Sequence, residues 1–290
     1  MKTKIIKITT PKKVLLNGII FGPEKPKNVF IFIHGLASDL FAKVDLYEKL
    51  INKDTAVLAF NNRGSGIISG VKKITARNKK GFEYVDAGMA HEKFTDCYDD
   101  IEGAVLEAIK TGAKNIYLIG HSTGCQKSVY FLSKNKKFKI KGVILLAPMS
   151  DFADVDTFVE KKIYSRALNL SRKLITQGKK HELLPLDIWP RLVDAQRFVS
   201  LFTPDSVEEI FSYATNREPK LLKKIIEPIL IIMAGEDEHK DRPISEIITW
   251  FNKNMSLKNY DIRVVEKSMH SFSRYENELE KIIKNWIKNT

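Results

Sequence analysis

Short apolar runs alternate with longer stretches of helical periodicity along most of the chain. Several of these runs are continuously apolar, which is typical of parallel strands that are covered on both faces. We predict strands at residues 4–9, 14–21, 29–33, 55–60, 115–119, 142–147, 229–234 and 261–265. We predict helices at residues 98–109, 126–132, 245–251 and 276–287. The alternation indicates a mostly parallel central sheet flanked by helices.

Two stretches interrupt this alternation. Residues 67–92 are polar and rich in glycine and lysine, so we expect a loop longer than compact domains usually contain, of a kind that is often functional. Residues 151–224 lie between two core strands, yet they contain several helical patterns broken by prolines. We expect a helical lid over the carboxyl edge of the sheet; the alternative is a plain extension of the core. With the lid, the core consists of residues 1–150 and 225–290.

The predicted lid carries apolar and aromatic side chains among its charges. Some of them should pack on the core, because a short helical insertion cannot sustain a core of its own. The others should face the cleft and form an acyl or alcohol pocket, and Trp189 and Phe202 are the first candidates. The lid would then decide between substrates of different size.

Residues 120–124 read Gly-His-Ser-Thr-Gly and lie between a predicted strand and a predicted helix. They match Gly-x-Ser-x-Gly, the pattern of a sharp turn that presents a serine hydroxyl above a sheet. The turn closes only when small residues stand two positions on either side of the serine. The pattern is weak alone and strong in this strand-to-helix context. We therefore predict that Ser122 is a nucleophile.

A serine hydroxyl needs a base to take its proton, and a histidine is required here. Where this elbow occurs, the chain order is nucleophile, acid, histidine, so the base should follow Ser122. His181, His239 and His270 meet this condition. His270 follows the strand at residues 261–265 on a loop at the carboxyl edge. His181 falls in the lid and His239 in a charged turn, so we expect both on the solvated surface. We predict His270 as the base, with a satisfied structural histidine as the alternative.

The histidine needs an acid that fixes its tautomer and stabilises the imidazolium. Asp237 follows the strand at residues 229–234, again at the carboxyl edge. Glu236, Glu238 and Asp241 are its competitors, and a merely acidic surface turn is the alternative. If Asp237 faces the site, Glu236 and Glu238 should point elsewhere. We predict Asp237 as the acid.

The oxyanion that develops in acyl transfer needs two preorganised donors, each worth about 3 kcal/mol of transition-state stabilisation. We predict the backbone N–H of Thr123, the residue after the nucleophile, as one donor. The other should come from the loop after the strand at residues 29–33, and Leu36 is the expected donor. His34 lies in the same loop but precedes the nucleophile, so we expect it to stabilise the loop.

Further short motifs accompany the elbow along nearly the whole chain. They are His34-Gly35, Asn62-Arg63-Gly64-Ser65-Gly66, Gly235-Glu236-Asp237 and Met269-His270-Ser271-Phe272. In order and spacing the set resembles the α/β-hydrolase superfamily, which implies an α/β-hydrolase fold. The turn at residues 62–66 resembles that of esterases and acyl-peptide-type hydrolases. Residues 120–126 are similar to a branch that includes fungal siderophore esterases. The chain lacks a His-Gly-Gly-Gly motif, which argues against the hormone-sensitive-lipase type.

Composition changes this picture little. Hydrophobic residues make up 43% and charged residues 29% of the 290 residues, the balance of a globular protein. The net charge of +13 comes from scattered lysines, so we expect no nucleic-acid partner. Two cysteines fit a reducing compartment, and we see neither a signal peptide nor a membrane span, so we expect a cytoplasmic protein. No His/Cys cluster has ligand spacing, so we expect no metal or organic cofactor.

These residues predict a serine hydrolase that cleaves a small-molecule carboxylic ester through an acyl-enzyme. Ser122 attacks, His270 accepts its proton and passes it to the leaving alcohol, and Asp237 orients His270. The same triad could serve a thioesterase, a peptidase or an acyltransferase, and a fold alone does not choose among them. A non-catalytic binding protein and nucleic-acid association through the basic surface are more distant alternatives.

Overall fold

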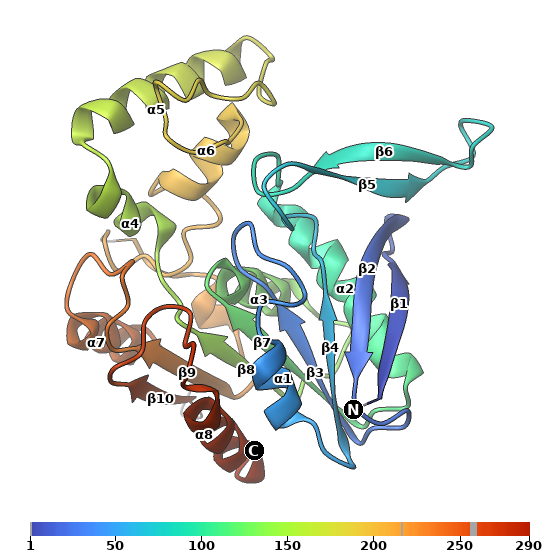
Figure 1. Cartoon of the computed structure of the whole chain (residues 1–290). Helices are drawn as coiled ribbons and strands as arrows, with labels where there is room; N and C mark the ends of the chain where they lie inside the picture. The colour runs from blue at the N-terminus through green and yellow to red at the C-terminus, as the bar shows by residue number, and fades with distance from the viewer. Residues whose placement is uncertain (1, 216, 256–259) are drawn as a thin grey trace.

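A ten-stranded sheet forms the centre of the computed structural model, which describes residues 2–215, 217–255 and 260–290 (Figure 1). In chain order the strands are β1 (Thr3–Thr9), β2 (Val14–Phe21), β3 (Asn28–Ile33), β4 (Thr55–Phe60), β5 (Ser69–Ile74), β6 (Phe82–Ala87), β7 (Asn115–His121), β8 (Gly142–Leu146), β9 (Ile229–Ala234) and β10 (Tyr260–Val265). Their order in space is β10-β9-β8-β7-β3-β4-β2-β5-β6, and β1 pairs with β2. The strands from β10 to β4 are parallel. The mostly parallel sheet predicted from the sequence is confirmed.

Helices cover both faces of this sheet. They are α1 (Val44–Leu50), η1 (Phe94–Asp96), α2 (Cys97–Lys110), α3 (Thr123–Lys134), α4 (Asp151–Phe158), α5 (Lys161–Thr176), α6 (Ala195–Phe202), η2 (Leu222–Lys224), α7 (Ile244–Asn254) and α8 (Glu276–Lys288), where η marks a 3₁₀ turn. Side chains of α2, α3 and α7 pack into one core layer, and those of α1 and α8 into the layer on the opposite face. Within the described ranges, we find no helix that is long and apolar enough to cross a membrane.

The continuous apolar runs follow from these two layers. Successive residues of a strand point to opposite faces, so a strand between two helical layers must be apolar at every position. In β3, Val29 and Ile31 enter the layer of α2 and α3, whereas Phe30 and Phe32 enter the layer of α1 and α8. Because the parallel strands are in register, their carboxyl ends meet at one edge, where the candidate site lies.

Residues 67–92 contain a β-hairpin in place of the predicted loop. β5 pairs with β6 along its whole length but with β2 at two positions only, and the hairpin projects from the sheet (Figure 1). Both strands are largely exposed, so they lack the regular buried stripe that reveals a strand in a sequence. The Lys72 ammonium lies 4.4 Å from the Phe82 ring centroid, a cross-strand contact that only the folded pairing creates. The loop prediction was wrong because this pairing has no apolar signature.

The helical segment, which we define as residues 151–224, packs in two separate places. As far as α6 its apolar side chains form a third core cluster around Trp189, Phe198 and Phe202. The rings of Trp189 and Phe198 meet edge to face, with centroids 4.8 Å apart. Farther along, Phe211 belongs to the core layer of α2 and α3. The segment thus combines a separate small core with an anchor in the main one.

As expected, some apolar side chains of this segment pack on the core, and its cluster is not self-contained. Its cluster is completed by Met89, from the loop after β6, and covered by Leu36 and Ala37, from the loop after β3. Apolar surface supplied by the main domain buries what a small insertion would otherwise expose to water. The separate cluster therefore rests directly on loops at the carboxyl edge of the sheet.

We expect Trp189→Ala to lower the free energy of unfolding by about 3–5 kcal/mol, because truncation of this fully buried ring leaves a cavity in the third cluster. Leu186 lies in the same connection and is 60% exposed, so Leu186→Ala should change that free energy by less than about 0.5 kcal/mol. Urea denaturation followed by circular dichroism measures both values. Equal losses in the two variants would contradict the role given to Trp189.

Candidate active site

Ser122 stands at the turn between β7 and α3 in a strained backbone conformation. Its φ is 55° and its ψ is −129°, values that non-glycine residues rarely adopt. A Cβ added to Gly120 would lie 2.4 Å from the Gly124 carbonyl oxygen, and one added to Gly124 would lie 2.1 Å from the Ile33 carbonyl oxygen. Only glycine fits at either position, as the turn pattern requires. The structure therefore contains the sharp strand-to-helix turn that the sequence predicts.

Buried hydrogen bonds hold this turn. The Ser122 N–H donates to the Leu146 carbonyl at 3.0 Å, and the Cys125 N–H donates to the Ser122 carbonyl at 2.8 Å. The Cys125 thiol contacts the carbonyl oxygens of Gly120 at 3.3 Å and Leu146 at 3.2 Å. Burial raises the pKa of this thiol well above its ordinary value, so it remains a protonated donor. Cys125 thus stabilises the turn.

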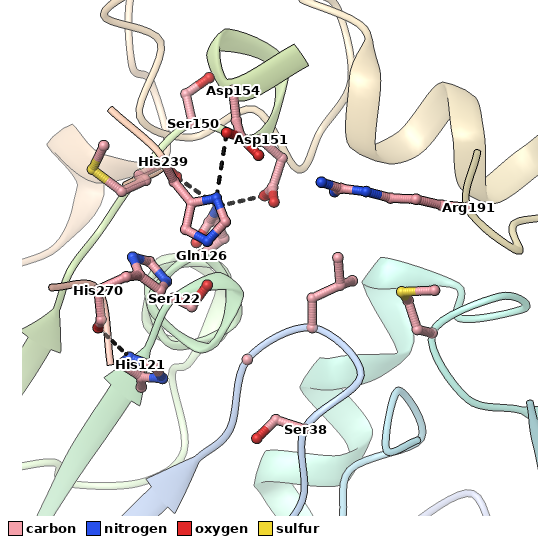
Figure 2. A pocket seen from close by; sticks show the side chains of 14 residues that line it. Ser38, His121, Ser122, Gln126, Ser150, Asp151, Asp154, Arg191, His239 and His270 are labelled. Carbon is pink, nitrogen blue, oxygen red and sulfur yellow. Dashed lines mark hydrogen bonds and ion pairs between the residues drawn. The ribbon is translucent and has the colours of Figure 1, made fainter. Parts of the chain in front are cut away.

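His270 and Asp237 meet at the same edge. His270 Nδ1 lies 2.8 Å from Asp237 Oδ2, whose side chain is completely buried. The second oxygen, Oδ1, accepts the His239 N–H at 2.9 Å. Because an ionised carboxylate only accepts, Nδ1 is the donor in the contact with His270. The ring lies beside the Ser122 side chain in Figure 2, so the structure brings the three predicted residues together.

Three further side chains bind the backbone around His270. Glu238 Oε2 accepts the His270 N–H at 2.8 Å, His121 Nε2 donates to the His270 carbonyl at 2.9 Å, and the Lys43 ammonium donates to the Ser271 carbonyl. Burial first, and then the charges of Lys43 and His270, lower the pKa of His121 well below its ordinary value. His121 is therefore neutral and can donate from one nitrogen. Glu236 and Glu238 are both exposed and lie outside the cavity lining, although the Glu238 carboxylate reaches the His270 backbone.

His239 also lies beside His270, so its placement on the solvated surface was wrong. The two ring centroids are 4.7 Å apart in an edge-to-face arrangement. His239 Nδ1 lies 3.3 Å from Asp154 Oδ1 of α4, and this hydrogen bond raises the pKa of His239 above its ordinary value against the opposing effect of burial. The sequence gave no local sign of this contact. His181 is more than half exposed and lies outside the cavity that contains His270.

The two predicted oxyanion donors are available. Within the described ranges, the backbone N–H groups of Leu36 and Thr123 have no hydrogen-bond acceptor in the protein. A Cβ on Gly35 would lie 2.8 Å from Ser122 Cβ, so the loop that carries Leu36 touches the elbow. Ala37, the next residue, has a φ of 53° that turns the chain sharply after the donor. Both N–H groups thus lie close to Ser122.

His34 has the contacts of a loop-stabilising residue. Its Nε2 accepts the Asn62 N–H at 3.1 Å, and its Nδ1 lies 2.9 Å from the Gly35 carbonyl oxygen. Burial, assisted by the nearby Lys127 charge, lowers the pKa of His34 to about 4. The imidazole is therefore neutral at physiological pH, with Nδ1 as donor and Nε2 as acceptor. It connects the loop after β3 with the loop after β4.

A cavity of about 440 Å³ lies in front of Ser122. Its walls come from both the sheet edge and the helical segment (Figure 2). The lining residues are Gly35, Leu36, Ser38, Met89, His121, Ser122, Gln126, Met149, Ser150, Asp151, Asp154, Arg191, His239 and His270. Trp189 and Phe202 are absent from this lining because they are buried in the third cluster. The expectation that they form the acyl or alcohol pocket was wrong.

Polar groups occupy the wall of the cavity that faces the helical segment. Gln126 Nε2 donates to the Met149 carbonyl and to Asp151 Oδ2, both at 2.9 Å. Burial raises the pKa of Asp151 well above its ordinary value, and the Glu208 charge raises it further against the opposing charge of Arg197. The Arg191 guanidinium lies 3.8 Å from the Phe158 ring centroid, which fixes its direction. The sequence did not single out any of these residues as cavity-lining groups.

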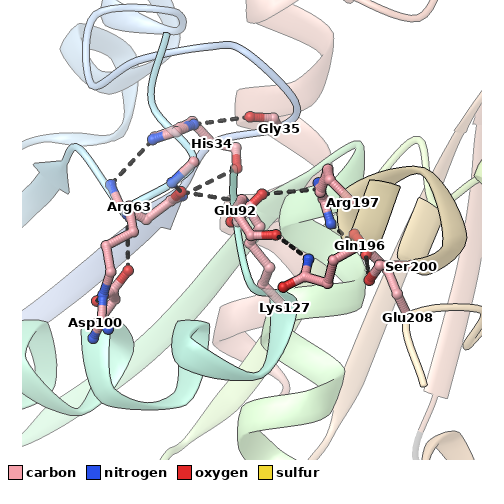
Figure 3. A network of polar contacts seen from close by, with 12 residues as sticks. His34, Gly35, Arg63, Glu92, Asp100, Lys127, Gln196, Arg197, Ser200 and Glu208 are labelled. Atoms are coloured by element: carbon pink, nitrogen blue, oxygen red, sulfur yellow. Dashed lines mark hydrogen bonds and ion pairs between the residues drawn. The ribbon is translucent and has the colours of Figure 1, made fainter. Parts of the chain in front are cut away.

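A buried ion network joins α3 to the helical segment (Figure 3). Glu92 Oε1 lies 2.6 Å from Lys127 Nζ of α3, and Glu92 Oε2 lies 2.9 Å from Arg197 Nη2 of α6. Arg197 Nη1 also lies 2.5 Å from Glu208 Oε2. Although burial alone would raise it, the pKa of Glu92 is lowered by the charges of Lys127 and Arg197. Glu92 is therefore ionised, and its two oxygens bind two separate elements.

Residues 91–286 match a protein-family model described as "Protein of unknown function (DUF1749)". The matched range covers about two thirds of the chain and includes the elbow, Asp237 and His270. The chain belongs to the DUF1749 family. This family is a member of the α/β-hydrolase clan. The superfamily expected from the motifs is thereby confirmed for this DUF1749 protein.

Solved structures similar to this DUF1749 protein confirm the α/β-hydrolase fold. The siderophore hydrolase EstB from Aspergillus fumigatus is 17% identical with a TM-score of 0.68, over 100% of this chain and 97% of that one. A thermostable carboxyl esterase from Bacillus coagulans is 14% identical with a TM-score of 0.67, over 100% of this chain and 99% of that one. Identities this low show a shared fold alone.

A curated relative of the DUF1749 protein covers a smaller part of the chain. It is a Mycoplasma genitalium protein named "Putative esterase/lipase 2". The identity is 30% over 144 residues, which are 49% of this chain and 46% of that protein. The match thus spans about half the length of the curated relative.

Proposed function

We propose that the chain is a serine hydrolase that cleaves a carboxylic ester through an acyl-enzyme intermediate, with Ser122 as the nucleophile. The observation that carries this proposal is the strained backbone of Ser122, with φ 55° and ψ −129°. Such a conformation costs about 1–3 kcal/mol and persists where the surrounding structure enforces it, often because a reactive group is being presented. The esterase names of similar proteins support the same reaction class.

The catalytic steps follow from the geometry around His270. Since Asp237 Oδ2 holds the proton on Nδ1, Nε2 of the neutral ring is left to accept the Ser122 proton as the hydroxyl attacks the ester carbonyl. The imidazolium then protonates the leaving alcohol, and Asp237 stabilises its charge. The N–H groups of Leu36 and Thr123 bind the oxyanion. Water hydrolyses the acyl-enzyme by the same route in reverse order.

In this proposal the helical segment acts as the lid, and the core consists of residues 1–150 and 225–290. The lid contributes Asp151, Asp154 and Arg191 to the cavity, so it supplies the polar wall. Leu36 and Met89, from the loops after β3 and β6, supply apolar surface to the cavity. A cavity of about 440 Å³ accommodates a small-molecule ester.

Ser122→Ala should abolish covalent labelling by a fluorophosphonate probe and reduce turnover of a short aryl ester by about 10⁴-fold or more, because no other group can form the acyl-enzyme. Ser38→Ala is the matched control, since its hydroxyl also lines the cavity but lies away from His270 (Figure 2). That variant should still be labelled. Labelling of Ser122→Ala at the wild-type rate would disprove the assignment. A parallel panel of thioesters and peptides distinguishes ester cleavage from the other reactions of such a triad.

Asp237→Asn should lower kcat by about 10⁴-fold, because an amide favours the wrong tautomer of His270. Glu238→Gln is the control, since a glutamine oxygen can still accept the His270 N–H that Glu238 binds at 2.8 Å. We expect Glu238→Gln to retain most of the activity. Steady-state kinetics, with circular dichroism to verify folding, compare the two. Equal losses in both variants would indicate a disturbed loop and contradict the role of Asp237.

Asp154→Asn should move the acid limb of the pH dependence of kcat/KM to lower pH. The bond from Asp154 raises the pKa of His239, and a protonated His239 beside His270 disfavours the imidazolium that the reaction must form there. Activity should therefore rise as pH increases through the His239 pKa, and loss of the carboxylate lowers that pKa. Asp156→Asn, on the exposed side of α4, is the control. Coincident profiles for the Asp154 variant and the wild type would contradict this coupling.

A further inference from the structure

Two histidines and an aspartate converge at a junction outside the cavity that contains Ser122. His91 lies on the loop after β6, His181 on the loop after α5, and Asp194 caps the start of α6. One potential ligand atom from each lies within 4.8 Å of the other two. Among the described residues, no other group of three or more histidine, cysteine, aspartate or glutamate side chains comes together in this way. The long separation of its members along the chain explains why no ligand spacing is visible in the sequence.

We propose that His91, His181 and Asp194 bind a Zn²⁺ ion that fastens the helical segment to the core. Two imidazoles and one carboxylate form a donor set that zinc accepts, with a water as the fourth ligand. Bonds of about 2.0–2.1 Å in a tetrahedron place neighbouring ligand atoms about 3.3 Å apart. Asp194 Oδ2 lies 3.1 Å from His91 Nδ1 and 3.0 Å from His181 Nδ1. Both distances lie within about 0.3 Å of that spacing, and the third pair of ligand atoms lies within 4.8 Å.

The backbone holds the three ligands in these places. The Asp194 N–H donates to the Ala90 carbonyl at 2.9 Å, which ties α6 to the residue preceding His91. The Gln196 N–H donates to the Lys180 carbonyl at 2.9 Å, which ties α6 to the residue preceding His181. These bonds connect the three segments without any metal. Binding of the ion therefore requires little rearrangement of the chain.

The orientation of the Asp194 carboxylate also favours a shared ligand. Oδ1 accepts the Arg197 N–H at 2.6 Å as the cap of α6, which leaves Oδ2 directed at both histidines. The carboxylate is fully buried, His91 is mostly buried, and His181 is more than half exposed. Zinc therefore has an entry path from the side of His181. Since both ring nitrogens must be unprotonated to bind it, affinity for the ion should fall at low pH.

The ion would affect the cavity through the two chain segments that it joins. Met89 and Arg191 line the cavity and belong to the same loops as His91 and Asp194. Metal bonds from His91 and Asp194 would fix the distance between the two loops that carry Met89 and Arg191. The proposal does not depend on the reaction assigned to Ser122, because it concerns binding and docking alone.

The experiment titrates metal-free full-length protein with Zn²⁺ against a chromophoric chelator and records thermal melts with and without the ion. We expect one Zn²⁺ per chain and a rise in melting temperature on the order of 5 °C when free Zn²⁺ exceeds its dissociation constant about 100-fold. His91→Ala and His181→Ala should each lose both effects. Asp194→Asn tests the carboxylate separately, because asparagine preserves the helix cap. Lys180→Ala, beside His181 but not a ligand, is the matched control and should retain both effects.

Limited proteolysis tests whether Zn²⁺ holds the helical segment against the core. Zn²⁺ should slow tryptic cleavage after Lys179 and Lys180 several-fold in the wild type and leave the rate unchanged in His91→Ala, where both cleavage sites remain. Retention of the stoichiometric ion by His181→Ala, together with its loss in His239→Ala, would place the metal in the cavity beside His270 and overturn the proposal. Absence of stoichiometric binding would show that the three side chains form only a histidine–carboxylate hydrogen-bond cluster, which also overturns it.

Discussion

The Glu92 carboxylate is the buried charge on which the arrangement of the site depends. It neutralises Lys127 on α3, whose N-cap is Ser122, and Arg197 on α6 of the helical segment, and all three side chains are buried. When a partner is removed from such a group, the remaining buried charge costs about 3–5 kcal/mol. A Cβ on Gly64 would lie 2.5 Å from the Glu92 carboxyl group, so the loop after β4 also closes on it. One ionised group thus holds three parts of the molecule in a fixed relation.

The same helix connects this network to the strained serine. The Ser122 conformation is maintained by close backbone contacts at Gly120 and Gly124 and by the Leu146 carbonyl, all of which belong to the sheet edge or to the start of α3. Because Lys127 lies one turn further along α3, displacement of that helix would disturb both the ion network and the elbow. This shared helix is part of the surrounding structure that allows a strained residue to persist.

Different residues of the helical segment form its buried core and line the cavity. Its large aromatic side chains are buried in the third core cluster, whereas Asp151, Asp154 and Arg191 line the cavity. Asp154 contacts His239, which packs against the His270 ring, so the charge on this cavity wall lies close to His270.

The sequence by itself determined the features that arise from local sterics and periodicity. A buried parallel strand must be apolar throughout, as in β9, and the elbow needs glycine on both sides of Ser122, so both are visible in a short window. The order of Asp237 and His270 after Ser122 identified the residues that the structure brings together. Tertiary structure alone decided the surroundings of His270, since His121, Glu238 and His239 act through contacts made across the fold. It also decided that Trp189 faces a separate core, because the direction of an aromatic side chain in an irregular connection depends on which distant surfaces are available to bury it.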